Sequence, residues 1–455
     1  MSTVSSSLLK SAARPDPLGW LLARPLDELI AVPCMFLIAF FNLTTLSDGD
    51  ADVKTELDMQ SLIKLALCGI AGLYSVYRMY VDPRMFKVMF GIPGVLLSLV
   101  CGFYLASSAV SISPLISFAS SLTTCACIWA TMAVALQIGV NRIVRILFAA
   151  CVAFVLASWL YLIANPTHAV FNEPLERGEF LRRFSGVSHP NTLGQFSAFV
   201  IMLLLTWYLP RRPTFGRWFL STILLVAAGG ALALSISRSS VAALVIASVF
   251  AFRRELMRGR VLIGGLIAAT IVCGVFVFVF GFTGLGDRAS TKLVGMVTKS
   301  GTAEEITSGT GRDAIWAESA RLISARPFTG YGAATSKTLL ANFNRYTHNL
   351  FLNVALSAGL ITMGLLVLAF LFGFWQAVTR PSPVADGLLM LIFVNGLTEN
   401  VAFLVIDSAP LVLLTLALVW RSVEALTESN HNDNQTLQSN APSKSAPRLD
   451  GAIPT

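Results

Sequence analysis

A polar stretch begins at Ser308-Gly309-Thr310-Gly311-Arg312-Asp313-Ala314-Ile315-Trp316 and ends at Thr347-His348-Asn349, where a long apolar run starts. Ser308 or Thr310 is suited to cap a helix, and Asp313 suits the first turn that follows. Residues of one mostly apolar helix face then recur at helical spacing until Pro327: Ile315, Trp316, Ser319, Leu322 and Ile323. The pattern predicts a helix lying on a membrane domain, in a polar loop that brings a histidine to the boundary between water and lipid.

The composition is that of an integral membrane protein. The 455 residues are 55% hydrophobic and only 13% charged, whereas a soluble domain carries about 25% charged residues. Apolar runs of membrane-spanning length recur along most of the chain. We therefore predict an all-α polytopic membrane protein with about twelve transmembrane helices, near 28–46, 60–80, 86–107, 114–138, 143–164, 192–209, 217–236, 239–252, 261–283, 348–375, 384–400 and 408–424.

The distribution of basic residues predicts the orientation. Alternate connections and the helix ends beside them hold most of the Lys and Arg residues, which the positive-inside rule places in the cytoplasm with both termini. We expect a cytoplasmic segment at 1–26 without a removable signal peptide, followed by a transmembrane domain at 27–425 with outer loops at 165–191 and 284–347. The remainder, 426–455, is rich in Ser, Asn, Gln and Pro and predicts a disordered cytoplasmic tail.

The two long outer loops do not follow this charge rule. The first contains Arg177, Arg182 and Arg183, and the second contains Arg288, Lys292, Lys299, Arg312, Arg321, Arg326, Lys337 and Arg345. A purely topological account would leave such loops neutral, so the cations indicate an anionic ligand on the outer face. No aromatic and basic surface module of the kind that binds nucleic acid is evident.

The seven cysteines argue against a disulfide framework or a metal centre. All of them fall inside apolar runs, and none lies in a polar loop. The pair Cys125 and Cys127 lacks the two-residue spacer of a metal or redox motif. We therefore expect small buried side chains, no metal ligands and no cofactor.

His348 is the candidate for chemistry at the outer face. Gly359 lies eleven positions after it, close to three turns at about 3.6 residues per turn, which would place both on one helix face. Gly359 would lie roughly 16 Å deeper and let a neighbouring helix approach. Glu399, at the outer end of its own helix, is placed to orient His348. The alternative interpretation is an interfacial histidine that only anchors the helix.

Two arginines are candidates for binding a phosphate. Arg312 follows a glycine turn at a predicted helix start, where free backbone N–H groups suit an anion. Arg238 lies in Ser235-Ile236-Ser237-Arg238-Ser239-Ser240, which joins two apolar helices with almost no loop, so it needs an anion or carbonyl groups nearby. The alternatives are a solvated arginine at a turn and an arginine that reaches lipid headgroups.

A third motif runs from Phe184 to Gln195 and enters the sixth predicted helix. Pro190 near the helix start is structural, and Asn191 is suited to cap the helix. His189 and Asn191 are candidates for contact with a sugar or a phosphate.

These motifs, in this order, resemble the O-antigen ligase and O-antigen polymerase superfamily of bacterial envelope glycan assembly. The matching segments are Gly186 to Gln195, Ser235 to Ser240, Gly309 to Trp316, Arg326 to Gly332, and His348-Asn349 with Gly359 and Thr362. The segment from Gly186 to Gln195 looks most like the exopolysaccharide-polymerase branch. The first 140 residues agree only in being membrane helices.

The resemblance implies a metal-independent, inverting glycosyltransferase of GT-C-like fold in the bacterial inner membrane. Its partners would be an undecaprenyl-diphosphate-linked glycan, an acceptor glycan and the lipid bilayer, together with a chain-length regulator and a flippase of the same pathway. Arg238 and Arg312 would bind the lipid diphosphate, and His348 would be the general base. We expect the substrate site to include His189, Asn191, Arg183, Asn349, Arg345 and Glu399.

Three functions remain open from the sequence. The first is polymerisation of lipid-linked repeat units, and the second is a ligase that moves finished glycan to lipid A core or another acceptor. The third is a transporter for lipid-linked sugars. A transporter should place charges in the middle of the membrane on broken helices, whereas the cations here gather at the outer rim, so transport is disfavoured.

Overall fold

A computed structural model describes residues 27–41, 59–174, 180–210, 214–257, 312–343, 346–403 and 409–439. Among these, seven helices are long and apolar enough to cross a membrane: α3 (Met59–Val81), α5 (Ile92–Ser107) with the turn after it, α6 (Pro114–Ile138), α7 (Val140–Ala164), α9 (Phe215–Ser235), α17 (Leu350–Thr379) and α19 (Ala409–Ser439). Shorter apolar helices are α2 (Val32–Phe40), α10 (Arg238–Ala251) and α18 (Pro383–Gly396). The polytopic, mostly helical prediction is confirmed; the span predicted at 261–283 lies outside the described residues.

Proline marks the start of several helices. Pro93, Pro114, Pro190 and Pro383 all occupy the first turn of their helices, where the missing N–H has no intrahelical partner to lose. The α8 helix (Pro190–Leu203) begins in this way and continues into a π-helical turn, η4 (Leu204–Tyr208).

Three predicted helix boundaries were wrong. The helix expected at 28–46 ends at Phe40. The helix expected at 86–107 is two helices, α4 (Arg84–Met89) and α5, because the chain folds back so tightly that a Cβ at Gly94 would lie 2.2 Å from the Val88 carbonyl oxygen. The last helix, expected to end near 424, continues to Ser439, so the first part of the predicted tail is helical.

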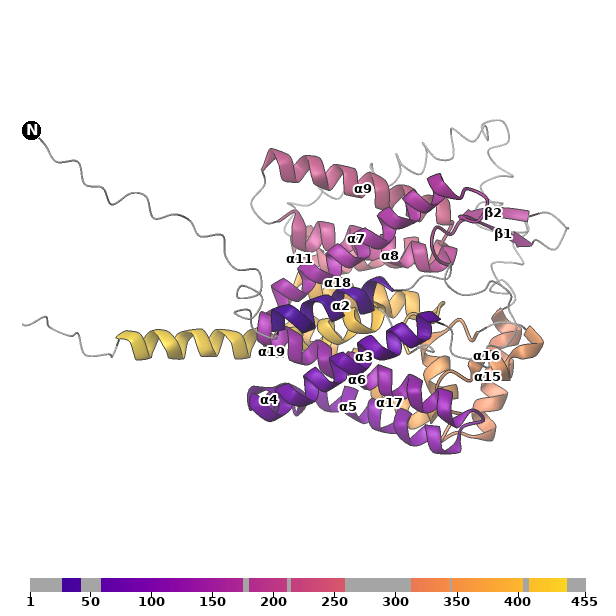
Figure 1. Cartoon of the computed structure of the whole chain (residues 1–455), viewed down its shortest axis with the longest axis horizontal. Helices are drawn as coiled ribbons and strands as arrows, with labels where there is room; N and C mark the ends of the chain where they lie inside the picture. Colours follow the sequence, from indigo (N-terminus) through magenta and orange to yellow (C-terminus); the bar gives the residue numbers. More distant parts are fainter. Residues whose placement is uncertain are drawn as a thin grey trace, which may run out of the picture.

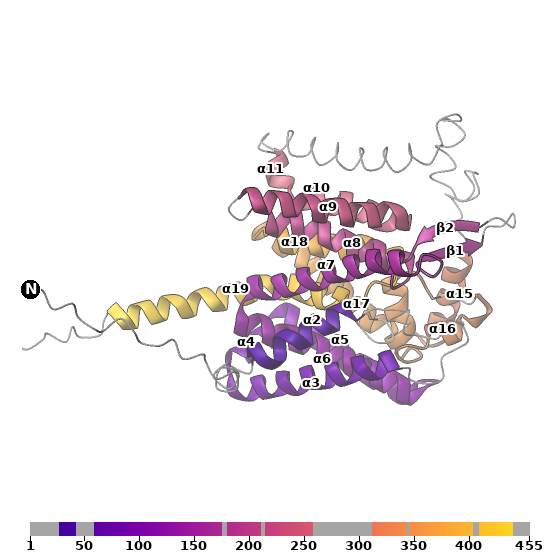
Figure 2. The same ribbon diagram turned by 45° about the horizontal axis from the view of Figure 1, so that its top comes forward.

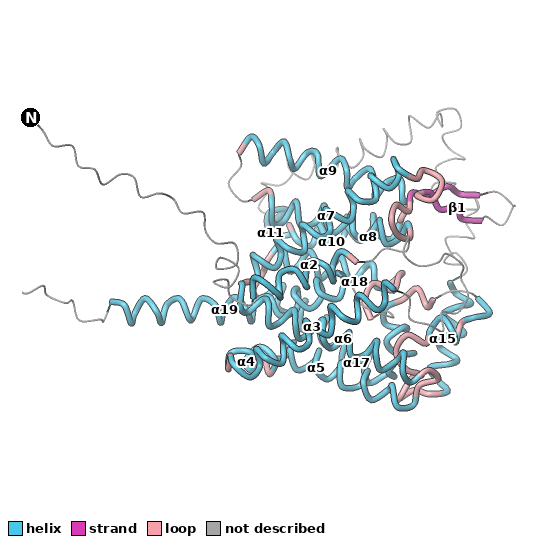
Figure 3. Tube along the Cα trace, viewed as in Figure 1, coloured by secondary structure: helices cyan, strands magenta, loops and turns pink. Residues whose placement is uncertain are grey.

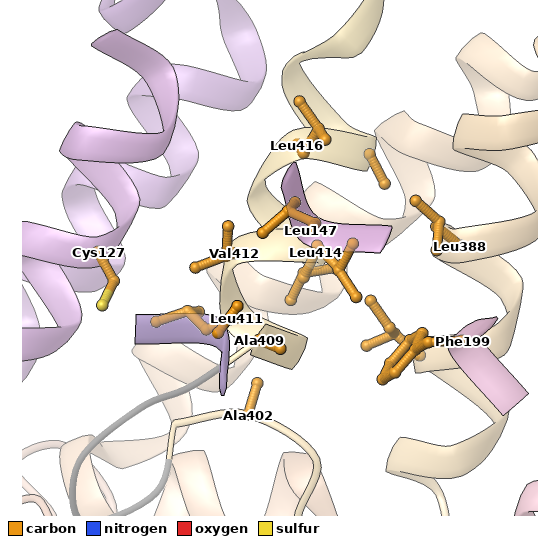
Figure 4. Packing of buried hydrophobic residues seen from close by; sticks show 14 of the residues in the cluster. Cys127, Leu147, Phe199, Leu388, Ala402, Ala409, Leu411, Val412, Leu414 and Leu416 are labelled. Atoms are coloured by element: carbon orange, nitrogen blue, oxygen red, sulfur yellow. The ribbon is translucent and has the colours of Figure 1, made fainter. Parts of the chain in front are cut away.

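The core is built around two central helices. α6 and α19 are 83% and 78% buried over their apolar stretches, against 28% for α3. Figure 4 shows α19 side chains such as Leu411 and Leu414 among residues from four other helices: Cys127 of α6, Leu147 of α7, Phe199 of α8 and Leu388 of α18. The helices around α19 therefore position the loops at either end of the bundle.

The two ends of the bundle carry different elements (Figures 1 and 2). One end holds α15 (Arg312–Ala325), α16 (Ser336–Leu339) and the strands β1 (Val170–Pro174) and β2 (Phe180–Phe184). The opposite end holds α4, α11 (Arg253–Met257) and the part of α19 that projects from the bundle. The segments predicted to be outer and those predicted to be cytoplasmic thus lie at opposite ends.

The strands are the main departure from an all-α fold. They form an antiparallel hairpin with Val170 opposite Phe184 and Pro174 opposite Phe180, shown in magenta in Figure 3. The predicted outer loop at 165–191 therefore contains two paired strands, and α8 begins shortly after the second of them.

The long helix α17 is interrupted at Gly359, whose φ of 86° is non-helical. The turn after α15 fills the break, since Leu360 N donates to the Pro327 carbonyl at 2.7 Å and Gly332 N donates to the Ser357 carbonyl at 2.8 Å. A Cβ at Gly359 would lie 2.2 Å from the Phe328 carbonyl oxygen, so only glycine fits. The expectation that His348 and Gly359 share a continuous helix face was wrong, and the close neighbour at Gly359 is this turn.

Candidate active site

The loops at the hairpin end bring distant parts of the chain to one carboxylate, that of Glu399. Glu399 follows α18 and is buried, with 6% of its surface exposed. Its Oε1 accepts from Arg312 Nη2 at 2.7 Å and from Asn191 Nδ2 at 2.9 Å. Its Oε2 lies 3.0 Å from His348 Nδ1. Three of the residues predicted as site residues therefore meet at a fourth.

The contact with Glu399 fixes the tautomer of His348. An ionised carboxylate only accepts hydrogen bonds, so Nδ1 of the imidazole carries the proton and donates it to Oε2. Nε2 is then left with a free lone pair that can accept a proton. The side chain of His348 is 23% exposed, against 7% for that of Glu399. A partly exposed imidazole that a buried carboxylate holds in this tautomer can act as a general base.

The backbone of His348 is held in an unusual conformation. Its φ is +47°, in the left-handed region that non-glycine residues seldom adopt. Asn400 fixes the residues on both sides of it, because its Oδ1 accepts from Thr347 Oγ1 at 2.8 Å and from Asn349 N at 2.9 Å. Sequence analysis missed Asn400, although it directly follows Glu399 at the end of an apolar run.

Arg312 is delivered by the predicted amphipathic helix. Ile315, Ser319 and Ile323 of α15 are buried, as the spacing predicts, and Ile323 packs against Leu356 of α17. Trp316 Nε1 donates to the Thr347 carbonyl at 2.9 Å, which attaches α15 directly to the residue before His348. The position of Arg312 and that of His348 are therefore coupled.

The hairpin supplies the other side of the site through Arg183. Each nitrogen of its guanidinium donates a hydrogen bond: Nε to the Ser235 carbonyl at 2.8 Å, Nη1 to Glu173 at 2.9 Å and Nη2 to Asn191 Oδ1 at 2.5 Å. Arg183 is also 5% exposed. This arrangement does not favour the substrate contact predicted for Arg183, and it indicates that Arg183 positions Asn191.

Asn349 also has a structural position. Its Oδ1 accepts from Leu352 N at 3.0 Å and caps α17, and its Nδ2 donates to the Leu397 carbonyl at 3.0 Å. Both ends of the amide are occupied, so the predicted substrate contact is not favoured here either. Asn191, which was expected to cap α8, instead lies in the first turn, and His189 is the cap residue.

Two further residues were predicted for the site, Arg238 and Arg345. Arg238 is the first residue of α10 and half-buried, three residues after the Ser235 carbonyl that Arg183 binds. Ile236, in the turn before it, has a φ of +52°, which confirms a tight connection. Arg345 and the segment Ser308 to Gly311 lie outside the described residues.

The charges in the site keep Glu399 ionised. Burial acts to raise its pKa, but the hydrogen bond from His348 and the positive charge of Arg312 outweigh burial, so the pKa is lowered. His189 behaves differently. The groups packed around its ring and the guanidinium of Arg183 disfavour its charged form and lower its pKa to about 4. The site therefore combines one buried carboxylate, one arginine paired with it and two histidines in different environments.

Comparison with protein families gives the site a context. Residues 223–368 match the family model described as O-antigen ligase. The predicted resemblance is confirmed. The match to the O-antigen ligase family model spans 146 of the 455 residues, about a third, and includes Arg238, Arg312 and His348. The flanking parts of the chain contain other residues of the site: Arg183, His189, Asn191 and Glu399. A search of curated proteins found no match to this chain.

Proposed function

We propose that this multi-pass membrane protein is a glycosyltransferase that polymerises undecaprenyl-diphosphate-linked oligosaccharide repeat units at the periplasmic face of the bacterial inner membrane, in exopolysaccharide or O-antigen assembly. The observation that carries the proposal is the contact of His348 with Glu399, inside a network that includes Arg312. Two of these three residues, His348 and Arg312, lie in the stretch that matches the O-antigen ligase family model. The GT-C-like architecture that the resemblance implies remains a prediction.

The chemistry follows from the tautomer of His348. Nε2 removes the proton from the acceptor hydroxyl, and the Glu399 carboxylate stabilises the imidazolium that forms. The acceptor oxygen attacks the anomeric carbon of the donor sugar as the bond from that carbon to the diphosphate oxygen breaks. Undecaprenyl diphosphate leaves with the bonding electron pair. Attack opposite the leaving group inverts the anomeric centre.

The leaving diphosphate needs positive charge, which we assign to Arg312 and Arg238. Among the described residues, the guanidinium of Arg312 has one partner, Glu399, through Nη2. An arginine carries five N–H donors, so the remaining ones are available to phosphate oxygens. Arginines in place of a metal ion account for the proposed metal independence. Transfer by the purified protein should therefore continue in EDTA, and chelator-sensitive transfer that Mg²⁺ restores would contradict this part of the proposal.

The second candidate function is an O-antigen ligase that transfers finished glycan to lipid A core or another acceptor. The description of the matched family supports it, whereas the motif from Gly186 to Gln195 supports the polymerase. Transport of lipid-linked sugars receives less support, because the charged network lies at one end of the helices. As a polymerase, the protein would work with a chain-length regulator and a flippase of the same pathway.

Glycan chain length in a deletion strain separates the candidates. If the protein is a polymerase, long chains disappear and single repeat units accumulate on the lipid carrier. If it is a ligase, long chains persist and stay on undecaprenyl diphosphate. Complementation with the wild-type gene and with His348→Ala is the matched control, since both proteins should be present in the membrane and only the first should restore the product.

A further inference from the structure

His189 occupies the junction between β2 and α8 as the N-cap of the helix. Its backbone is extended, with a φ of −80° and a ψ of 146°, and its Nδ1 accepts from Asn191 N at 3.3 Å. A ring nitrogen that accepts a hydrogen bond carries no proton, so in the neutral ring the proton is on Nε2. No other hydrogen bond of this ring is found in the part of the chain that the structure describes. Nε2–H is thus a donor that the protein does not use.

The surroundings of His189 keep this donor in place and neutral. The ring lies against Phe171 of β1, with 5.4 Å between the ring centroids. The groups packed around the ring are the main cause that lowers the pKa of His189 to about 4; Arg183 and His348 lower it further, whereas Glu399 and Glu173 act to raise it. The residue as a whole is nevertheless partly open to solvent. A neutral imidazole in this tautomer offers one N–H to a ligand and takes no proton from it.

The two histidines of the site are therefore in opposite tautomers. His348 donates from Nδ1 to Glu399 and presents an acceptor at Nε2, whereas His189 accepts at Nδ1 and presents a donor at Nε2. Asn191 connects them. Its backbone N–H donates to Nδ1 of His189, and its side chain donates to the Glu399 carboxylate that holds His348. A substrate between them would meet a base on one side and a hydrogen-bond donor on the other.

We propose that His189 binds the lipid-linked glycan through Nε2–H, as a neutral hydrogen-bond donor to a sugar hydroxyl or a phosphoryl oxygen, and takes no part in proton transfer. The inference rests on the proposed function and deepens it by separating binding at His189 from base catalysis at His348. The alternative is a purely structural role, in which His189 only caps α8 through the hydrogen bond that Nδ1 accepts from Asn191 N.

Two amide substitutions separate the capping role of Nδ1 from the proposed donor role of Nε2, because each reproduces the position of one ring nitrogen. The side chain of asparagine reaches the position of Nδ1, so His189→Asn keeps the cap acceptor and removes the donor. The side chain of glutamine reaches the position of Nε2, so His189→Gln keeps the donor and loses the cap. His189→Ser is a second variant that preserves the cap, and its side chain is too short to reach the position of Nε2.

The experiment measures binding of purified undecaprenyl-diphosphate oligosaccharide to the full-length protein in nanodiscs, without turnover. We expect His189→Asn and His189→Ser to weaken binding about two- to tenfold, the value of one net hydrogen bond, and His189→Gln to bind within about twofold of wild type because the donor remains. Thermal unfolding of each variant monitors the cap separately.

The reverse pattern overturns the proposal: normal binding by His189→Asn with a loss in His189→Gln would assign His189 to capping alone. Equal binding by all variants would overturn it as well. A parallel titration with undecaprenyl diphosphate that carries no sugar identifies the contacted group, since a defect there indicates a phosphoryl oxygen and a defect only with the oligosaccharide indicates a hydroxyl. Failure of the wild-type protein to bind either lipid would contradict the proposed function itself.

Discussion

Each end of α18 has a buried carboxylate that binds side chains from distant parts of the chain, but the two carboxylates bind different kinds of side chain. At the hairpin end, Glu399 binds Arg312 and His348, whose side chains are 20% and 23% exposed. At the opposite end, the Asp386 side chain is fully buried and binds Arg253 and Arg421, whose side chains are 21% and 5% exposed. The second cluster also ties Arg421 Nε to the Arg380 carbonyl at 2.6 Å.

We infer from this difference that the Asp386 cluster stabilises the fold and that the Glu399 cluster takes part in the reaction. Both partners of Asp386 also donate to backbone carbonyls, as Arg253 does with Phe250 at 2.6 Å and Arg421 with Arg380. Within the described residues, the side chains of Arg312 and His348 hydrogen-bond to Glu399 alone, and one of the two is a histidine whose proton can move. We therefore expect variants at Asp386 to change the free energy of unfolding and variants at Glu399 to change turnover.

The largest effect should come from Asp386→Asn. The amide keeps the shape of the side chain but leaves two guanidinium groups without their counter-charge, and breaking a buried ion pair in this way costs about 3–5 kcal/mol. The amount of folded protein in the membrane should fall sharply, while turnover per folded molecule should stay near the wild-type value. Size-exclusion profiles and thermal unfolding check stability. A stable but inactive variant would show that the two clusters do not differ as we describe.

The next comparison pairs Arg312→Lys with Arg253→Lys. Lysine is a point charge and does not reproduce bidentate binding of a diphosphate. Arg312→Lys should lower the transfer rate by about 10²- to 10³-fold, the usual effect of losing one positioned donor to a developing charge. Arg253→Lys, the matched control at the other end of α18, should lower the unfolding temperature and leave the rate per folded molecule unchanged. Equal rates for both variants would remove the diphosphate role of Arg312.

The smallest effect concerns the support of His348. Thr347→Val keeps the shape of the side chain and removes the hydroxyl that donates to Asn400. Loss of one net hydrogen bond at this point should lower turnover about two- to tenfold, with little change in donor binding. Thr362→Val in the middle of α17 is the control, since its hydroxyl donates only to the Ala358 carbonyl. A larger loss in Thr362→Val than in Thr347→Val would contradict the positioning role.

Several elements of this comparison could be predicted from the sequence. Apolar runs and first-turn prolines such as Pro114 and Pro383 place the helices, because burial and the missing proline N–H act locally. The contact between Glu399 and His348 could be predicted, because both residues lie at the outer ends of predicted helices. The buried side of α15 follows from the spacing of Ile315, Ser319 and Ile323.

Other features depend on contacts that no local pattern specifies. The turn at Pro327 enters the break at Gly359 through backbone hydrogen bonds, which depend on the three-dimensional course of the chain. The positive-inside rule explains Arg253 and Arg421 only as topological charges, because their common partner Asp386 is distant in sequence. The contacts of Asn400 on both sides of His348 likewise need the folded geometry.

The most direct test of the account is the behaviour of His348→Ala in a reconstituted assay with purified lipid-linked donor and acceptor. If Nε2 of His348 removes the acceptor proton, transfer should fall by about 10²- to 10⁴-fold while donor binding and protein abundance stay near wild type. Near-normal turnover by the alanine variant would contradict the base role, and loss of the protein from the membrane would assign His348 to anchoring the helix.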